Sequence, residues 1–203
     1  MRTKEITIHS SGEGMNEALE LAESVGAEAA LTERQSRQLR LLTEELLGML
    51  RAITGDAVAQ FWIEREDRLC RLHLAADPRM DKEMRRQLLS AASSGENAAA
   101  QGFMGRLREA IAGVMLPERA NEPTLFALGA MSMSSPGSYR AGSVSYEWSL
   151  RQYREAVGGR KDGDDEASVA WDELEKSIVA NIADEVSVGI LGDEVEMIVT
   201  KAF

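Results

Sequence analysis

The sequence has little cysteine and little histidine, and both shortages narrow the range of functions. Its 203 residues include one cysteine and two histidines. A single cysteine cannot form an internal disulfide or a cysteine metal cluster, and it suits a reducing compartment. Cys70 alternates with Leu72 and Leu74, a pattern typical of a small core residue rather than of a nucleophile.

Long apolar runs and positive charge are also scarce. No apolar run approaches the roughly 20 residues that span a bilayer, and residues 1–6 lack the apolar stretch of a signal peptide. We therefore expect a cytoplasmic protein without a membrane partner. With 23 Lys and Arg against 34 Asp and Glu, the net charge of -11 repels phosphate backbones. Nucleic acid is accordingly not expected as a partner.

The N-terminal part of the chain predicts a strand followed by two helices. Ile6 and Ile8 alternate with polar residues, as in a half-buried strand. A helix from 15 to 25 follows, and Gly26 is expected to end it. The second helix, at 32–53, begins with a capping box formed by Thr32 and Gln35. Its apolar residues recur at spacings of three and four: Leu39, Leu42, Leu46, Leu50 and Ile53.

Two segments show the two-residue period of β-hairpins. The first comprises residues 57–64 and 70–74, joined by a polar turn. One face carries Ala59, Phe61 and Ile63, and the other carries Gln60, Trp62 and Glu64. The second hairpin comprises residues 186–190 and 195–203. No fixed-period internal repeat is visible, which excludes a solenoid.

The middle of the chain is less regular. Helices are predicted at 80–93, 102–115 and 168–184, and a shorter one at 146–157. Residues 117–145 read as a long surface loop and residues 158–165 as a polar linker. We therefore expect a single domain over 1–203 with a flexible or helical insertion at about 117–165, and a disordered insertion is an equal alternative.

Hairpins outnumber strand-helix-strand crossovers in this order of elements. This favours an α+β fold, a two-layer α/β sandwich whose mixed, mostly antiparallel sheet has its helices on one face. Three short segments follow one another in a suggestive order within it: Leu41–Gly48 on the long helix, Leu74–Asp81 after the first hairpin, and Gly102–Leu107 at a helix start. In this order the chain resembles the GHKL-type ATP-binding fold of gyrase, heat-shock 90 chaperones, histidine kinases and MutL, and especially the bacterial anti-sigma-factor serine kinases.

The resemblance assigns roles to individual residues. Glu44 or Glu45 would match the glutamate that positions the nucleophile in a Glu-x-x-x-Asn box. The asparagine that holds Mg²⁺ one helical turn later is replaced by Gly48 or Met49. Neither side chain can ligate a metal.

The other two segments would bind the nucleotide. Asp77 would match the carboxylate that accepts a hydrogen bond from the adenine amino group, although Arg79 and Asp81 replace the glycines of the Asp-x-Gly-x-Gly loop. Gly102 and Gly105 would match the helix start that offers N–H groups to phosphate. The alternative without a functional role is that these carboxylates are solvated helix or turn residues and that the glycines only permit a turn.

His9 and His73, the two histidines, lie on separate predicted strands, and the spacing around them matches no metal motif. The leading interpretation is a regulatory protein-binding module on a degenerate GHKL-like fold, without phosphoryl transfer or a cofactor, whose partner surface involves 117–165. One alternative is an active serine protein kinase that uses ATP and Mg²⁺, and another is an α/β structural protein without a nucleotide site. A homodimer is left open.

Overall fold

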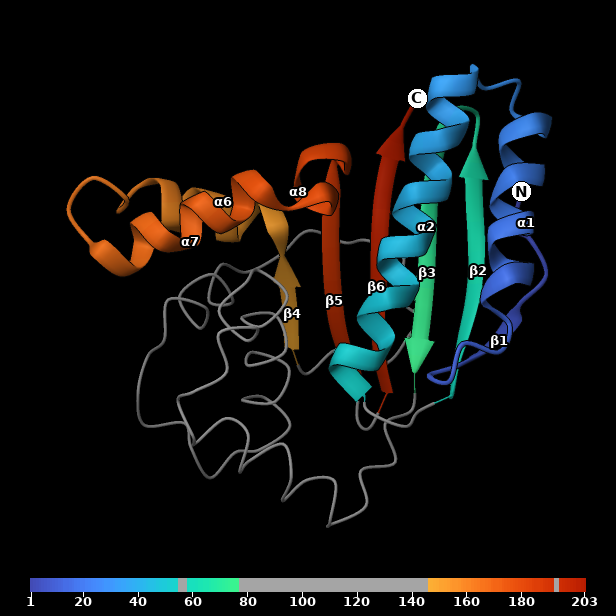
Figure 1. Ribbon diagram of the computed structural model, residues 1–203, viewed down its shortest axis with the longest axis horizontal. Helices are drawn as coiled ribbons and strands as arrows, with labels where there is room; N and C mark the ends of the chain where they lie inside the picture. Colours follow the sequence, from blue (N-terminus) through green and yellow to red (C-terminus); the bar gives the residue numbers. More distant parts are fainter. Residues whose placement is uncertain (55–57, 77–145, 192–193) are drawn as a thin grey trace, which may run out of the picture.

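The computed structural model describes residues 1–54, 58–76, 146–191 and 194–203, which form an open sheet with helices (Figure 1). The elements are β1 (Ile6–His9), α1 (Met15–Glu28), α2 (Glu33–Thr54), β2 (Val58–Glu66), β3 (Leu69–Ala76), β4 (Tyr146–Ser149), α6 (Leu150–Gly158), α7 (Asp165–Lys176), α8 (Ile178–Ile182), β5 (Glu185–Leu191) and β6 (Glu194–Ala202). The six strands are ordered β1-β2-β3-β6-β5-β4, and every pairing among them is antiparallel. The predicted α+β class is confirmed.

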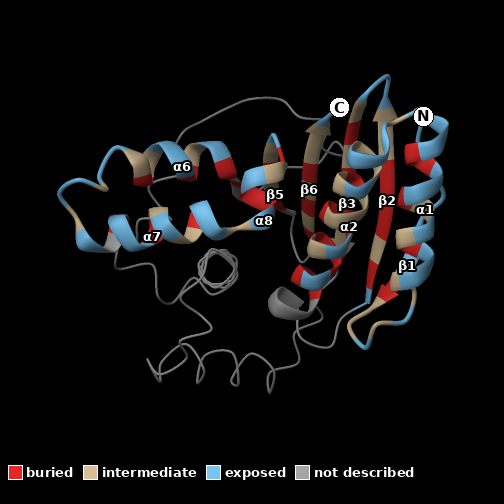
Figure 2. Ribbon diagram, turned by 45° about the horizontal axis from the view of Figure 1, so that its top comes forward, coloured by how far each residue is buried: buried red, intermediate tan, exposed pale blue. Residues whose placement is uncertain are grey.

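The hydrophobic core lies between one face of the sheet and the helices α1 and α2, and it continues into β4, α6, α7 and α8 (Figures 1 and 2). Alternate residues of the strands point into it, as the two-residue period predicts. The residues of α2 that face the sheet are those predicted from their spacings of three and four. Fully buried members include Phe61, Ile63, Leu72 and Leu74 from the sheet and Leu39, Leu42, Leu46 and Leu50 from α2.

The start of α2 is fixed by the predicted capping box. The backbone N–H of Thr32 donates to Gln35 Oε1 over 3.0 Å, and the backbone N–H of Gln35 donates to Thr32 Oγ1 over 3.4 Å. Each side chain thereby satisfies a backbone donor that the first helical turn leaves without a partner. The beginning of this helix is therefore determined by four consecutive residues.

The prediction that Gly26 ends the first helix is wrong. α1 continues to Glu28, and Gly26 is buried inside it. A Cβ atom at this position would lie 3.1 Å from Ser36 Oγ of α2, so glycine allows the two helices to pack closely. The chain instead leaves the helix at Ala30, whose φ of 49° lies in the left-handed region.

Gly48 is the opposite case, because it is exposed in the middle of α2 and a Cβ atom added there would meet nothing within 4 Å. Gly48→Ala should raise the free energy of unfolding by about 0.5–1 kcal/mol, since alanine loses less backbone entropy in a helix. Urea denaturation of both proteins measures this change. Gly26→Ala is the matched control and should give no such gain, and equal stabilisation by both substitutions would contradict the packing described for Gly26.

The bounds of the C-terminal helices differ from those predicted. Residues 146–149 form the edge strand β4 rather than the start of a helix, and α6 follows with Ser149 as its cap. The predicted helix at 168–184 is divided at Ser177, whose hydroxyl caps α8 by accepting from the Ala180 N–H over 3.2 Å. The serine hydroxyl can bond a nearby backbone N–H in place of the helical carbonyl, so a serine within a helical pattern favours a new helix start.

Part of the predicted linker is also structured, because α7 already begins at Asp165. The remaining predictions for the middle of the chain, the helices at 80–93 and 102–115 and the loop at 117–145, lie outside the described residues.

The two hairpins repeat one arrangement on either side of the sheet centre. Phe61 pairs with Leu74 and Val186 pairs with Val199, so adding 125 to both numbers of the first pair gives the second. Each hairpin is preceded by helices and an outer strand, and β3 meets β6 in the middle. The sequence shows no repeat because equivalent core residues are hydrophobic without being identical. The sheet therefore has an approximate two-fold axis.

Asp184 ties the entrance of β5 to the end of β6. Its carboxylate accepts from the Ala202 N–H and from Lys201 Nζ, each over 2.7 Å. Partial burial by itself would raise the pKa of Asp184, but these two donors and the positive charge of Lys201 outweigh burial and lower it. Asp184 therefore favours the folded state whenever it is ionised.

The sign of this linkage predicts how stability depends on pH. A lowered folded-state pKa gives stabilisation that is complete above the unfolded value of about 3.9 and is lost as the pH falls through the folded pKa. We expect Asp184→Asn to be less stable than the original chain near pH 7, by less than about 1 kcal/mol because the pair is solvent-screened. The difference should vanish in acid, and denaturation curves between neutral pH and strong acid measure it. A constant difference would contradict the assigned cause.

Candidate functional site

The residues proposed for catalysis lie on the C-terminal half of α2. Glu44 is exposed and Glu45 is half-buried. Gly48 is exposed, while Met49 is buried in the core with only 3% of its surface exposed. Neither position therefore presents an oxygen ligand beside the two glutamates. The proposed nucleotide contacts Asp77, Gly102 and Gly105 lie outside the described residues and remain predictions.

The two histidines lie on strands that are separated by β2. His9 pairs with Val58 at the end of β2, whereas His73 pairs with Trp62, four residues further along that strand. Their strands β1 and β3 flank β2 on opposite sides. Four residues of strand correspond to roughly 13 Å, so the structure does not bring the histidines into a shared site.

His73 instead belongs to a row of flat groups on the sheet face that none of the described helices covers. Its imidazole stacks on the Trp62 indole, with ring centroids 4.7 Å apart and planes inclined by 11°. The Arg2 guanidinium lies 4.6 Å from the centroid of the same indole and is held by Glu5 over 2.7 Å. We call Arg2, Trp62 and His73 the stacked row. Such stacks are favourable because the indole face is electron-rich.

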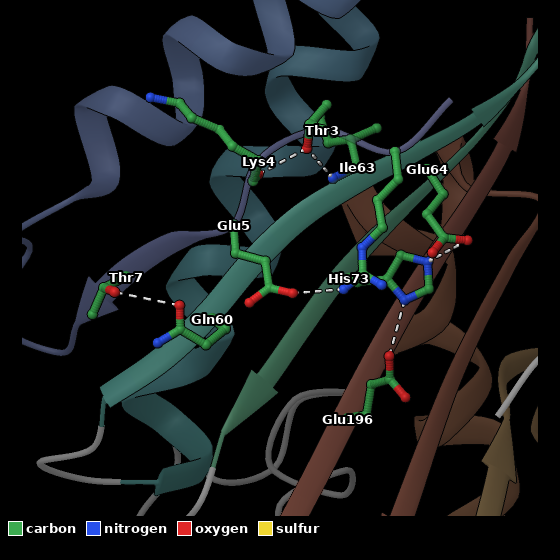
Figure 3. Close-up of polar contacts among 10 residues, drawn as sticks. Thr3, Lys4, Glu5, Thr7, Gln60, Ile63, Glu64, His73 and Glu196 are labelled. Carbon is green, nitrogen blue, oxygen red and sulfur yellow. Dashed lines mark hydrogen bonds and ion pairs between the residues drawn. The ribbon is translucent and has the colours of Figure 1, made fainter. Parts of the chain in front are cut away.

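Two carboxylates flank the imidazole (Figure 3). His73 Nδ1 lies 2.9 Å from Glu196 Oε1. Because an ionised carboxylate only accepts, Nδ1 carries the hydrogen and donates it. His73 Nε2 lies 3.7 Å from Glu64 Oε2, which is longer than a hydrogen bond.

Two nitrogen atoms of this row have no partner. The side-chain nitrogens Trp62 Nε1 and His73 Nε2 are buried and form no hydrogen bond. His73 as a whole is 5% exposed and Trp62 is 9% exposed. Buried polar atoms are nearly always paired in folded proteins, and leaving one unpaired costs about 1–3 kcal/mol. These two atoms therefore need an explanation.

The approximate two-fold axis supplies an internal comparison. The equivalents of Trp62 and His73 on β5 and β6 are Ser187 and Ile198, and the equivalent of Glu64 is Gly189. The second hairpin therefore completes the same sheet without an aromatic ring, an imidazole or a carboxylate at these places. The stacked row is therefore a feature of the first hairpin alone.

Cys70 behaves as the sequence predicts. It is fully buried on the core face of β3. Burial raises the pKa of its thiol, and the nearby positive charge of Arg65 offsets this only in part. A thiol held in its neutral form is a poor nucleophile, so Cys70 is a packing residue.

Sequence reasoning finds the separate members of this site but not their assembly. The two-residue period places Trp62 and Glu64 on the polar face of the first hairpin, where a large indole is unusual. Glu196 cannot be connected to His73 from the sequence, because 123 residues separate them. The one indication that the sequence offers is the indole on a face otherwise predicted to be polar.

Comparisons with known proteins give no information on this site. No protein-family model matches the chain, and neither curated proteins nor solved structures show a significant similarity to it. Within the described ranges, no group of three or more His, Cys, Asp or Glu side chains is placed to hold a metal ion. In the same ranges, no helix has the length and apolar character needed to cross a membrane.

Proposed function

We propose that this chain is a regulatory protein-binding module whose partner docks on the sheet face that carries the stacked row. The observation that supports this most directly is the pair of unsatisfied nitrogens, Trp62 Nε1 and His73 Nε2, at the middle of that face. Large aromatic groups with unused polar atoms are enriched at protein interfaces, where the partner supplies the missing hydrogen bonds.

The internal comparison strengthens the proposal. The stacked row occurs in one half of the sheet only, because the second half has Ser187 and Ile198 in place of the indole and the imidazole. Maintaining unpaired polar atoms in one half only costs stability. A binding role explains why that cost is tolerated.

The proposal includes a degenerate GHKL-like ancestry without phosphoryl transfer. In that family the metal-binding oxygen follows the catalytic glutamate by one helical turn. Here Gly48 has no side chain and the side chain of Met49 is buried in the core. This is what a fold retained for binding would show. A contribution of residues 117–165 to the partner surface stays a prediction.

Site-specific photo-crosslinking tests the docking face. A photoreactive residue at Gln60, on this face, should capture one defined partner in cells, whereas one at the exposed Glu20 of α1 should not. Replacing Trp62 by alanine in the Gln60 variant should abolish the product. Crosslinking that is equal at both positions, or unchanged by the loss of Trp62, would contradict this function.

The active-kinase alternative predicts a different result. If the chain binds Mg-ATP, millimolar Mg-ATP should raise its melting temperature, because a ligand at about 100 times its Kd adds roughly 2.7 kcal/mol. We expect no shift, either with Mg-ATP or with ATP and EDTA. A clear rise that Asp77→Asn abolishes would overturn the non-catalytic proposal and justify a kinase assay.

A further inference from the structure

The connection between α6 and α7 contains an aspartate followed directly by a glycine, a dipeptide that occurs nowhere else in the sequence. Asp162 and Gly163 are both exposed, and they lie at the end of the helix pair that points away from the sheet (Figures 1 and 2). A Cβ atom added at Gly163 would meet nothing within 4 Å. No neighbouring side chain therefore crowds the backbone at this glycine.

Few contacts hold this dipeptide in place. In the ranges that the structure describes, no hydrogen bond or ion pair joins the Asp162 carboxylate to another residue. The backbone N–H of Gly163 donates to the Arg160 carbonyl over 3.1 Å, within an exposed turn. Such turns open locally at little cost in free energy. Opening this one bond leaves the Gly163 nitrogen next to an unengaged carboxyl group.

The neighbouring Asp164 shows the opposite situation. Its Oδ1 accepts from the Ala167 N–H over 3.2 Å, and its Oδ2 accepts from Arg160 Nη2 over 2.8 Å. This carboxylate is therefore engaged in capping the start of α7. The residue that follows it is Asp165, whose side chain hinders approach to its own backbone nitrogen. The structure thus separates Asp162 from the acidic residues beside it.

We propose that Asp162 and Gly163 form a site of spontaneous aspartate isomerisation. The Gly163 nitrogen attacks the side-chain carboxyl carbon of Asp162 and forms a C–N bond. The nitrogen gives up its hydrogen and the carboxyl group its hydroxyl, and the two leave as one water molecule. The product is a five-membered succinimide ring. Glycine favours this step because it has no Cβ to obstruct the ring.

One water molecule from solvent then opens the ring. It adds to the former main-chain carbonyl of Asp162, and the bond from that carbon to the Gly163 nitrogen breaks. The chain now runs through the aspartate side chain, and the old main-chain carbonyl has become a free carboxylate. One water is lost and one is gained, so the step is an isomerisation without a change of mass or of oxidation state.

The modification has a structural consequence at α7. Isoaspartate adds one methylene group to the backbone of a short connection, two residues before the cap of that helix. We expect Asp164 to lose its hydrogen bond to the Ala167 N–H, and the first turn of α7 to open. The sheet face that carries the stacked row is not involved, so this inference does not depend on the proposed function.

Ageing the full chain at neutral pH and body temperature for several weeks tests the site. A protein-isoaspartate methyltransferase with S-adenosylmethionine is the probe, because it methylates the new free carboxylate. Electron-transfer fragmentation of the tryptic peptide 162–176 then locates the isoaspartate. We expect it to accumulate at Asp162 and not at Asp172, an exposed aspartate of the same peptide that is followed by glutamate.

A variant and a reference peptide decide the outcome. Gly163→Val should slow accumulation at least about tenfold, because a β-branched side chain crowds the attacking nitrogen. The open space around Gly163 lets the variant fold, and circular dichroism checks this. Equal accumulation in the variant, or at Asp172, would overturn the proposal. So would an unchanged Asp162 after a time in which a synthetic peptide of residues 158–168 isomerises, since the folded turn would then protect the site.

Discussion

Phe61→Ala should lower the free energy of unfolding by about 3–5 kcal/mol. Phe61 lies fully buried on the core face of β2, between its strand partners Ile6 and Leu74. Removing its ring forfeits the transfer free energy of the buried atoms and leaves a cavity that a tightly paired antiparallel sheet cannot close. This cost is a large fraction of the stability of an ordinary domain. Chemical denaturation followed by circular dichroism measures it.

The matched control lies on the same strand. Val58→Ala shortens a side chain that is 45% exposed on the opposite face, so its effect should stay within about 0.5 kcal/mol. A small effect of Phe61→Ala, or similar effects of both substitutions, would mean that β2 does not present these faces as described. If the Phe61 variant does not fold at all, the direction of the prediction is still met, and Phe61→Leu then provides the measurable and smaller loss.

His73→Ile should weaken partner binding at least about tenfold while leaving the fold intact. The substitution removes the imidazole that stacks on Trp62, and so removes a central member of the proposed docking face. Stability should change by no more than about 1 kcal/mol, because isoleucine already occupies the equivalent position, 198, across the two-fold axis. Replacing a buried polar group by a hydrophobic one of similar size is often neutral.

Two measurements on the same variant separate binding from folding. Crosslinking yield at Gln60 reports binding, and the denaturation midpoint reports stability. Ser187→Ala, at the equivalent of Trp62, is the control and should change neither quantity. A His73→Ile variant that unfolds would show that the imidazole is a structural requirement, and one that binds normally would remove His73 from the interface.

The sequence was most informative where structure depends on neighbouring residues. The start of α2 follows from Thr32 and Gln35, three positions apart, and the hairpin β2–β3 follows from a period that switches at a short polar turn. Gly26 shows the limit of such reasoning. A glycine reads as a helix stop from its own preferences, but its role here is set by Ser36 on another helix.

The candidate site shows the same limit more strongly. The indole and the imidazole lie eleven positions apart on one predicted hairpin, so the sequence could predict that they are neighbours. Glu196 comes from a strand that joins β3 only through the order of the whole sheet. The short strand β4 is a related case, because four residues carry little periodicity and become a strand only by pairing with β5.

The sequence by itself determined the acidic character of the chain, the helices α1 and α2, the two hairpins and the α+β class, because each depends on composition or on contacts between residues close in the chain. The tertiary structure alone decided the strand order, the approximate two-fold axis and the face on which Trp62, His73, Glu64 and Glu196 meet. Pairing of β3 with β6 joins segments more than 100 residues apart, and no local preference encodes such a contact.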